Sequence, residues 1–265
     1  MKLSIIFILL VLFSGYLLYR YPSPPKFPIS TFPHGILIAH AAGEISGHPY
    51  TNSKEAIAQS LSKGYQFVEL DLRLSQDKYI VAVHDWKQFH TMTGHTGEQT
   101  IPLEEFEKRK IYSHYTPVTY KDINTLFSQG DVFLVTDKIE QFDIVNEQLR
   151  IPANSLMVEV FSYKSYVKAL RKGIKYPMLC FWTAESLKEH KLLFRTGRIR
   201  MITIPEDLIQ SAEAEIEELY KSGVIVIAFS SNDAAFIKAH MGHCVHGFYS
   251  DSVTGGDIIA HDRDG

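Results

Sequence analysis

The chain has 265 residues, of which 45% are hydrophobic and 22% charged, a balance typical of a folded globular protein. This length is normal for a single α/β barrel. Lys and Arg number 27 against 30 Asp and Glu, a formal net charge of -3, so the chain lacks the basic excess of a nucleic-acid-binding protein. The two cysteines, Cys180 and Cys244, exclude a disulfide scaffold, and we expect two buried free thiols because they lie in separate apolar segments.

The amino terminus carries an apolar run from Leu3 to Tyr19, between Lys2 and Arg20. A run of about 17 residues is at the short end for a membrane span and slightly long for the apolar part of a secretory signal. No clear Ala-x-Ala cleavage site follows it, so we favour an uncleaved signal anchor in residues 1–20 over a cleaved signal peptide. Either reading places the body outside the cytoplasm, periplasmic or extracellular. It is membrane-anchored in the first reading and secreted in the second.

Residues 21–33 are rich in proline and predict a tether, and residues 34–265 then alternate short apolar runs with helical patterns. The expected strands are Ile36–Ala39, Phe67–Leu72, Ile80–His84, Val132–Thr136, Leu156–Phe161, Met178–Trp182, Met201–Ile204, Val224–Phe229 and His246–Tyr249. The expected helices are Ser53–Lys63, Asp143–Leu149, Ser165–Lys172, Ala184–Leu193 and Ala212–Ser222. Alternating strands and helices predict a parallel sheet.

One pair of expected strands is too close for a parallel connection, which needs about a dozen or more residues. The short link around Asp77 therefore predicts a hairpin turn. Folding the chain there brings Glu69 opposite roughly Asp85, and Asp71 opposite roughly Val83. With the hairpin strand set aside, eight parallel units remain. We therefore predict a TIM-type (β/α)8 barrel with an extra β-hairpin strand.

Titratable residues gather at the ends of the first three expected strands, namely His40, Glu69, Asp71 and His84. Glu69 and Asp71 are two residues apart, so on a strand their side chains leave by the same face. Their apolar neighbours predict burial, and buried carboxylates need a partner or a metal. Carboxylates that hold a hard cation, and histidines that titrate near neutral pH, suit metal-assisted phosphodiester cleavage. The alternatives are a surface pair or a salt bridge to Arg73 for the carboxylates, and core histidines for the other two.

The segments HAAG, YTNSKEAI, FVELDL and VHDW together resemble the glycerophosphodiester phosphodiesterase family. Its pattern is His-Arg-Gly, then Pro-Glu-Asn-Thr, Glu-Leu-Asp and His-Asp. Weaker similarity continues through FLVTDK, AFSSND and HGFYSD, so it covers roughly residues 34–251. The resemblance implies that His40 is the catalytic base and His84 the catalytic acid. It also implies Mg²⁺ or Ca²⁺ bound by three residues, Glu69, Asp71 and Asp137.

The chain departs from the family pattern at three places. Ala41 replaces the Arg that follows the first His, and the Glu before Asn52 is missing. The third acidic residue is Asp137 instead of a Glu. An Asp there is similar to the sphingomyelinase D-like branch of the same PI-PLC-like superfamily, which also shares the 15-residue step from Glu69 to His84. These departures bear on the substrate more than on the chemistry.

Four further residues are expected near the substrate, namely Lys138, Asn52, Glu159 and Trp182. Strand alternation sends Asp137 and Lys138 to opposite faces, so both can point inward only at a bulge or at the end of the strand. Otherwise the two form a solvent-exposed pair. Asn52 could instead be a helix N-cap. Asp85 could orient His84 or cap the turn that follows.

The expected function is metal-dependent hydrolysis of a phosphodiester, with a bound cation and two histidines that transfer protons. One alternative is a phospholipase D-like lyase that forms a cyclic phosphate. The other is a barrel that binds a phosphorylated glycan or lipid headgroup without turnover, which the missing Arg and Glu favour. Both histidines and three acids remain, and these favour an enzyme. The expected partners are a small phosphodiester or a lipid or glycan headgroup, and a membrane through residues 1–20, with no nucleic acid.

Overall fold

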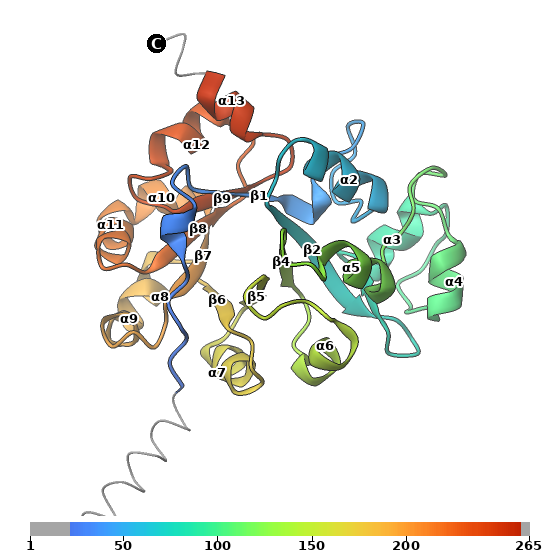
Figure 1. Ribbon diagram of the computed structural model, residues 1–265, viewed down its shortest axis with the longest axis horizontal. Helices are drawn as coiled ribbons and strands as arrows, with labels where there is room; N and C mark the ends of the chain where they lie inside the picture. Colours follow the sequence, from blue (N-terminus) through green and yellow to red (C-terminus); the bar gives the residue numbers. More distant parts are fainter. Residues whose placement is uncertain (1–21, 261–265) are drawn as a thin grey trace, which may run out of the picture.

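A computed structural model describes residues 22–260 of the chain. Its nine-stranded sheet has the order β1-β9-β8-β7-β6-β5-β4-β2-β3, and a further pairing of β1 with β2 closes eight parallel strands into a barrel (Figure 1). The strands are β1 (Ile36–Ala39), β2 (Phe67–Leu74), β3 (Ile80–Ala82), β4 (Phe133–Asp137), β5 (Leu156–Val160), β6 (Tyr176–Cys180), β7 (Met201–Pro205), β8 (Ile225–Phe229) and β9 (Gly247–Ser250). The predicted barrel with one extra strand is confirmed.

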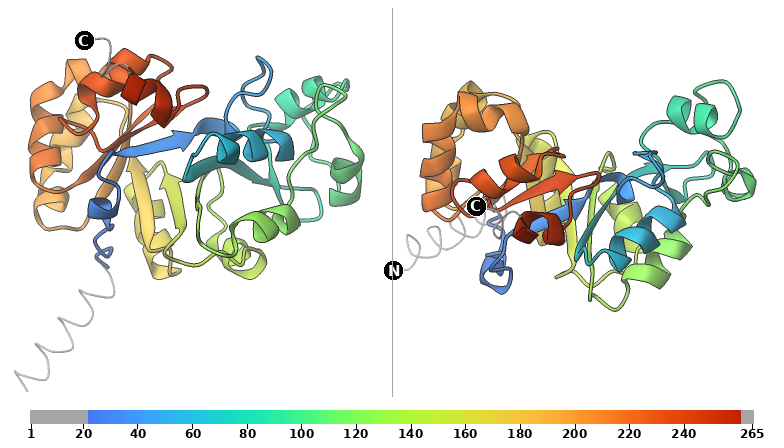
Figure 2. Two further views of the ribbon diagram at one scale, coloured as in Figure 1. Left: turned by 45° about the horizontal axis from the view of Figure 1, so that its top comes forward. Right: turned by 90° about the horizontal axis from the view of Figure 1, so that it is seen from above.

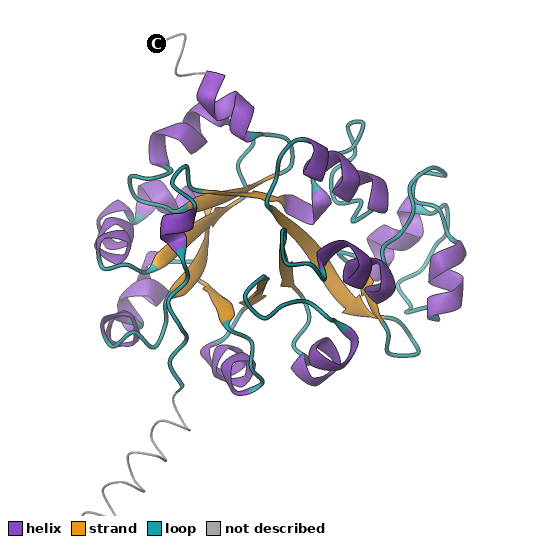
Figure 3. Cartoon of the chain, viewed as in Figure 1, coloured by secondary structure: helices purple, strands orange, loops and turns teal. Residues whose placement is uncertain are grey.

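Most of the helices surround the barrel on its outer side (Figure 3), while η1 lies at its amino-terminal end. They are η1 (Ile29–Thr31), η2 (His40–Ala42), α2 (Lys54–Ser62), α3 (Trp86–Met92), α4 (Leu103–Lys108), α5 (Tyr120–Phe127), α6 (Phe142–Gln148), α7 (Tyr163–Arg171), α8 (Ala184–Glu189), α9 (Lys191–Arg195), α10 (Glu206–Ser211), α11 (Glu213–Lys221), α12 (Ala234–His240) and α13 (Gly255–Ala260). The single helix expected over Ala184–Leu193 is two short helices that meet at His190. No helix within residues 22–260 is long and apolar enough to cross a membrane. The expected anchor in residues 1–20 lies outside the described residues.

The hairpin of β2 and β3 has the predicted register. Leu72 pairs with Ala82 in an antiparallel ladder, and the amide of Val83 donates to the carbonyl of Asp71 at 2.7 Å. Asp71 is therefore opposite Val83, as expected from the short link. The strand β3 ends at Ala82, and the chain then turns outward into α3 and α4. Both helices lie beside the hairpin, away from the barrel axis (Figure 1).

Alternation along β2 divides its side chains between two apolar layers. Val68 and Leu70 pack in the layer between strands and helices, whereas Phe67 packs inside the barrel. Each fully buried side chain of this size contributes about 1.5–3 kcal/mol to folding. Glu69 and Asp71 follow Phe67 on the interior side. The same alternation that fills the barrel with apolar side chains thus directs two carboxylates into it.

The amino-terminal end of the barrel is covered by the chain that precedes β1. The ring of Phe27 lies 5.0 Å from that of Tyr176 and 5.9 Å from that of Phe133, and the ring of Phe32 lies 4.9 Å from that of Phe67. Figures 1 and 2 show this segment, in dark blue, at one end of the barrel. Residues 27–32 of the segment predicted as a tether therefore pack with the barrel.

Both cysteines are free and buried, as expected.

Candidate active site

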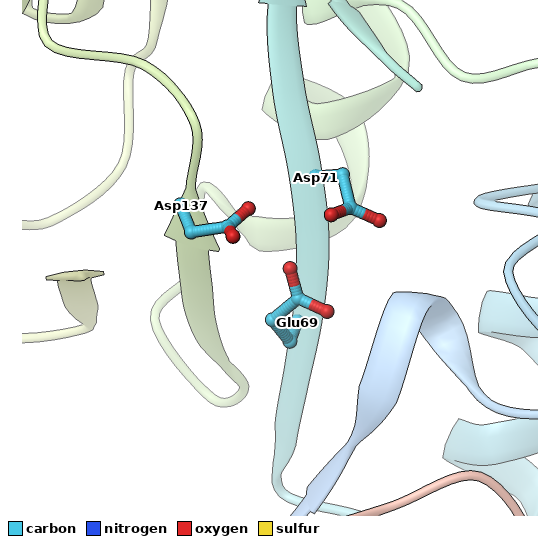
Figure 4. Close-up of side chains that lie close together, drawn as sticks. All are labelled: Glu69, Asp71 and Asp137. Atoms are coloured by element: carbon cyan, nitrogen blue, oxygen red, sulfur yellow. The ribbon is translucent and has the colours of Figure 1, made fainter. Parts of the chain in front are cut away.

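Three carboxylates meet inside the carboxyl end of the barrel. Glu69 and Asp71 come from β2, and Asp137 ends β4, where it pairs in register with Asp71. One oxygen from each of the three lies within 4.8 Å of the others, and Figure 4 shows the side chains converging between the two strands. Glu69 is 3% and Asp71 2% exposed, so these acids form neither a surface pair nor the salt bridge to Arg73. The guanidinium of Arg73 instead donates to the carbonyl of His84 at 2.8 Å.

Repulsion among the three buried carboxylates destabilises the ionised cluster when no metal ion is bound. Burial, together with the charges of Asp71 and Asp137, raises the pKa of Glu69 well above its usual range. Burial, and then the charge of Asp71, raises the pKa of Asp137 to about 8. Both shifts have the sign expected when like charges are brought together away from water. A bound cation would reverse them.

The oxygen atoms of this cluster fit a hard divalent cation. Glu69 Oε1 and Asp137 Oδ1 are buried and have no hydrogen-bond partner among the described residues. Buried polar atoms normally have a partner, and carboxylate oxygens are the ligands that Mg²⁺ and Ca²⁺ prefer. The remaining oxygen of Glu69 accepts from the amide of Ala41 at 2.6 Å. The orphaned oxygens therefore support the expectation that Glu69, Asp71 and Asp137 can hold a metal.

Lys138 also points into the site. Its Nζ lies 2.6 Å from Asp137 Oδ2 and 3.1 Å from Asp71 Oδ1. The strand β4 ends at Asp137, and Lys138 adopts a left-handed φ of 57°, so the alternation that would have directed it outward no longer applies. Burial opposes its charge, but the carboxylates of Asp137 and Asp71 outweigh burial and raise its pKa. Lys138 is thus a half-buried cation that faces the acids and keeps partial contact with solvent, and its expected place near the substrate stays a prediction.

Asn52 holds Asp71 in place. Its Nδ2 donates to Asp71 Oδ2 at 2.9 Å, and its Oδ1 accepts from the amide of Asp71 at 3.0 Å. The N-cap alternative is wrong, because Ser53 caps α2 by accepting from the amide of Ala56. Asn52 is buried, and these two bonds use both of its side-chain polar atoms. The geometry favours a positioning role, and the expected substrate contact stays a prediction.

His40 is oriented by Asp251, which follows β9. Its Nδ1 lies 2.9 Å from Asp251 Oδ1, and Asn232 Nδ2 donates to Asp251 Oδ2 at 2.8 Å. Burial alone would raise the pKa of Asp251, but the hydrogen bonds from His40 and Asn232 lower it. An ionised Asp251 can only accept, so Nδ1 of His40 carries the proton and Nε2 remains for chemistry.

His84 has a similar partner in Asp85. Its Nδ1 lies 3.0 Å from Asp85 Oδ2, while Asp85 Oδ1 accepts from the amide of Gln88 at 2.7 Å. Asp85 therefore both orients His84 and caps α3. Burial raises the pKa of Asp85, but its hydrogen bonds with Gln88 and His84 outweigh burial and lower it. The ring of Tyr50 lies between the two histidines, 4.8 Å from that of His40 and 5.4 Å from that of His84.

Sequence reasoning missed Tyr50, Asn232 and Asp251 as site residues. The segments AFSSND and HGFYSD already resembled the family, but nothing in one sequence indicates that Asp251 contacts His40 or that Asn232 contacts Asp251. Tyr50 begins the segment YTNSKEAI, but its ring has no counterpart in the Pro-Glu-Asn-Thr pattern of the family. Its left-handed φ of 59° is rare for a bulky residue, and no local sequence signal predicts it.

The two histidines and the acids line a cavity of about 330 Å³ at the carboxyl end of the barrel. Its other wall is aromatic, with Phe161, Phe229 and Trp182, and Trp182 is 59% exposed at the rim. Glu159 also lines the cavity and accepts from the hydroxyl of Tyr249 at 3.1 Å. The substrate contacts expected of Glu159 and Trp182 stay predictions, and both side chains are placed to make them.

The site keeps one strong cation of its own. Lys138 is the single Lys or Arg among the described residues that line the cavity. Ala41, which replaces the Arg of the family pattern, contributes only its backbone amide, to Glu69. It does so from a left-handed conformation, with φ 46°. Anion binding here would therefore depend on Lys138 and on a metal.

Comparison with known proteins identifies the family and the fold. The model of the glycerophosphoryl diester phosphodiesterase family matches residues 40–243. Among solved structures, one from Parabacteroides distasonis, a glycerophosphoryl diester phosphodiesterase, has a TM-score of 0.71 at 17% identity, over 91% of this chain and 93% of that chain. A phosphodiesterase from Oleispira antarctica, in complex with the product sn-glycerol-3-phosphate, has a TM-score of 0.67 at 19% identity, over 89% and 99%.

A glycerophosphodiester phosphodiesterase from Agrobacterium tumefaciens has a TM-score of 0.65 at 16% identity, over 87% of this chain and all (100%) of that chain. No curated protein matches the chain. The similar structures share the barrel, and the family model spans both histidines and all three acids. The chain therefore belongs to the glycerophosphoryl diester phosphodiesterase family, and is a phosphoric diester hydrolase.

Proposed function

We propose that this enzyme hydrolyses a glycerophosphodiester to glycerol phosphate and an alcohol, with His40 as general base and His84 as general acid. The observation that carries the proposal is the pair of orphaned carboxylate oxygens, Glu69 Oε1 and Asp137 Oδ1, in a cavity lined by both histidines. The product seen in the Oleispira antarctica structure supports glycerol phosphate as the product here.

Mg²⁺ or Ca²⁺ is the proposed cofactor, held by Glu69, Asp71 and Asp137. When bound, it would supply positive charge that stabilises the developing charge on the phosphoryl oxygens. Lys138 adds a fixed ammonium group beside the same acids. Asn52 keeps Asp71 in one rotamer through two hydrogen bonds, so the site is largely preformed.

The proton transfers depend on the two histidine–aspartate pairs. Asp251 and Asp85 each fix a proton on Nδ1, so Nε2 of either ring can accept or donate. His40 is 17% exposed and its partner is held by Asn232, whereas His84 is 35% exposed beside an Asp85 that is itself 42% exposed. We assign the enclosed His40 to deprotonating the nucleophile, and the open His84 to protonating the departing alkoxide at the mouth of the cavity.

The test is a panel of phosphodiesters, including glycerophosphocholine, glycerophosphoethanolamine and a lysophospholipid. Each is assayed with EDTA and then with added Mg²⁺ or Ca²⁺. Glycerol phosphate that forms only with the metal supports the proposal. A cyclic phosphate detected by phosphorus NMR would instead identify the lyase. Substrate binding by calorimetry without any product would identify the binding protein.

We also propose that residues 1–20 anchor the enzyme to a membrane, with the barrel outside the cytoplasm. The apolar run of Leu3–Tyr19 supports this placement. An anchored protein should stay with the membrane fraction in high salt, because apolar burial and not charge holds it there. A soluble mature form that begins between residues 14 and 25 would show that the segment is cleaved.

A further inference from the structure

The two ends of the barrel carry opposite charge. Eight segments run directly into the barrel strands at the amino-terminal end, namely 22–35, 63–66, 128–132, 149–155, 172–175, 196–200, 222–224 and 241–246. They contain one acid, Asp131, against seven basic residues, namely Lys26, Lys63, Arg150, Lys172, Lys175, Arg198 and Arg200. We call this set the basic end. The chain as a whole has a net charge of -3, so the basic end is a local concentration.

The segments that follow strands β1, β4, β5, β6, β8 and β9 have the reverse balance. They contain one lysine, Lys138, and four acids, namely Glu44, Glu140, Asp233 and Asp251. The active-site cavity opens among these segments. The molecule therefore has an electrostatic axis along the barrel, with its positive end opposite the catalytic cavity.

Most of the basic end is open to solvent. Lys26, Lys63, Arg150, Lys172 and Lys175 are exposed. Lys172 pairs with Asp143 at 2.7 Å, whereas Lys26, Lys63 and Arg150 form no ion pair with another described residue. Cations just after a helix also offset the helix dipole, which accounts for Lys63 and Lys172. It does not account for Lys26 or Lys175, which lie beyond the last turn of any helix.

The basic end is also where the chain enters the barrel. Phe27 and Phe32 fix this segment against the strands, and the apolar run of Leu3–Tyr19 precedes it in the sequence. Seven residues, 20–26, separate the run from Phe27, and a link of that length reaches at most about 25 Å. An inserted run would thus keep the basic end close to the bilayer. A cavity of about 390 Å³ opens on the same end, lined by His34, Lys63 and Lys238.

We propose that the basic end is a docking surface for an anionic phospholipid membrane. Lys and Arg near such a surface are attracted within about one Debye length. Docking there points the catalytic cavity away from the bilayer. If the proposed function also holds, the substrate is a water-soluble glycerophosphodiester, because a lipid in the same bilayer would face the wrong end.

The test uses the full chain reconstituted in nanodiscs of phosphatidylcholine, with or without phosphatidylglycerol. Exposed lysines are labelled with an amine-reactive reagent and quantified by mass spectrometry. Lys26, Lys63, Lys172 and Lys175 should be labelled severalfold more slowly in anionic than in neutral nanodiscs, and high salt should remove the difference. Three exposed lysines on α3, α4 and α5 serve as internal controls and should not change, namely Lys87, Lys108 and Lys121.

Two matched triple variants make the test decisive. Lys63→Glu, Lys172→Glu and Lys175→Glu together should abolish the protection of Lys26. The same charge change at Lys87, Lys108 and Lys121 should preserve it. The docking surface would be overturned by equal labelling of Lys26 in both lipids. It would also be overturned if both triple variants lost the protection of Lys26 to the same extent. Association with neutral nanodiscs tests the anchor alone, and turnover of a soluble substrate tests the enzymatic activity alone. The anchor, the activity and the docking surface can therefore be disproved independently.

Discussion

The carboxyl and amino ends of this barrel are built from the same strands but differ in what they contribute to stability. At the carboxyl end, Ala41, Asn52 and Lys138 adopt left-handed backbone conformations, each of which costs roughly 1–3 kcal/mol in a non-glycine residue. Two carboxylate oxygens there lack partners. At the amino end, Phe27 and Phe32 pack against rings from the strands. The backbone strain and the unpaired carboxylates that lower stability are therefore at the carboxyl end, while aromatic packing at the amino end raises stability.

Removing the negative charge of one acid should have the largest effect, because the acid cluster serves catalysis and destabilises the metal-free fold. Asp71→Asn should lower turnover by at least about 10³-fold, because a bound cation supplies several kcal/mol to the transition state. The metal-free variant should nevertheless unfold at a higher temperature, because repulsion with Glu69 and Asp137 is relieved. Turnover and thermal unfolding are measured with EDTA and with Mg²⁺. Glu185→Gln, an exposed acid on α8, is the control and should change neither quantity.

A lower melting temperature of metal-free Asp71→Asn, with unchanged metal affinity by calorimetry, would contradict the ligand assignment. The same result would mean that the acids stabilise the fold, so the carboxyl end of the barrel would no longer differ from the amino end in this respect.

The two histidines should be separable by the leaving group. His40→Ala and His84→Ala should each lower turnover by about 10²–10⁴-fold, the usual range for one general acid or base. A nitrophenyl phosphodiester has a leaving group that departs without protonation, so it should rescue His84→Ala and leave His40→Ala impaired. Rescue of His40→Ala instead would exchange the two roles. Near-normal turnover of both variants on every substrate would remove the acid–base pair.

Much of the fold could be predicted because it depends on short-range patterns. The length of the link around Asp77 allowed only a hairpin, and the register that places Asp71 opposite Val83 followed from it. The two-residue spacing of Glu69 and Asp71 then fixed their common face. These are properties of a strand and a turn, and both are visible in the sequence.

The rest of the site depends on closure of the barrel. His40 and Asp251 are 211 residues apart and meet only because β1 pairs with β9. Lys138 points inward through a positive φ that favours glycine, and its residue type does not predict it. Phe27 packs against strands that begin more than 100 residues later. A single sequence carries no signal for contacts of this kind.

The aromatic cover of the amino end should affect stability and not catalysis. Phe27→Ala should lower the free energy of unfolding by about 3 kcal/mol, the lower part of the range for a buried phenylalanine. Turnover at 25 °C should change little, because Phe27 lies at the opposite end from His40 and His84. Denaturant unfolding and steady-state kinetics are measured on the full chain. Phe161→Ala, at the rim of the active site, is the matched variant, and it should affect KM more than stability.

The smallest expected effect is a dependence of stability on pH that comes from the acid cluster. The pKa of Asp137 rises to about 8 in the folded protein, through burial and the charge of Asp71, and that of Glu69 rises as well. Between pH 5 and 8, these two acids therefore bind more protons in the metal-free folded state than in the unfolded chain. Their contribution to the free energy of unfolding must then fall as pH rises, by at least about 1 kcal/mol, since one pKa unit corresponds to 1.36 kcal/mol. Burial lowers the pKa of His246 to about 4, which acts in the opposite direction, so the acid contribution is measured as a difference between variants.

Saturating Mg²⁺ should reverse this dependence, because a cation favours the ionised carboxylates and its affinity rises as they lose their protons. Without metal, Asp137→Asn should gain stability relative to the parent protein as pH rises, while Asp143→Asn, which changes an exposed acid on α6, should keep the pH dependence of the parent. Denaturant titrations at several pH values, with EDTA and with Mg²⁺, measure both effects. The same metal-free pH dependence in the parent protein and in Asp137→Asn would mean that the three acids are already compensated within the protein. Lys138 would then neutralise the cluster by itself, and the acids at the catalytic end of the barrel would destabilise the fold less than their geometry implies.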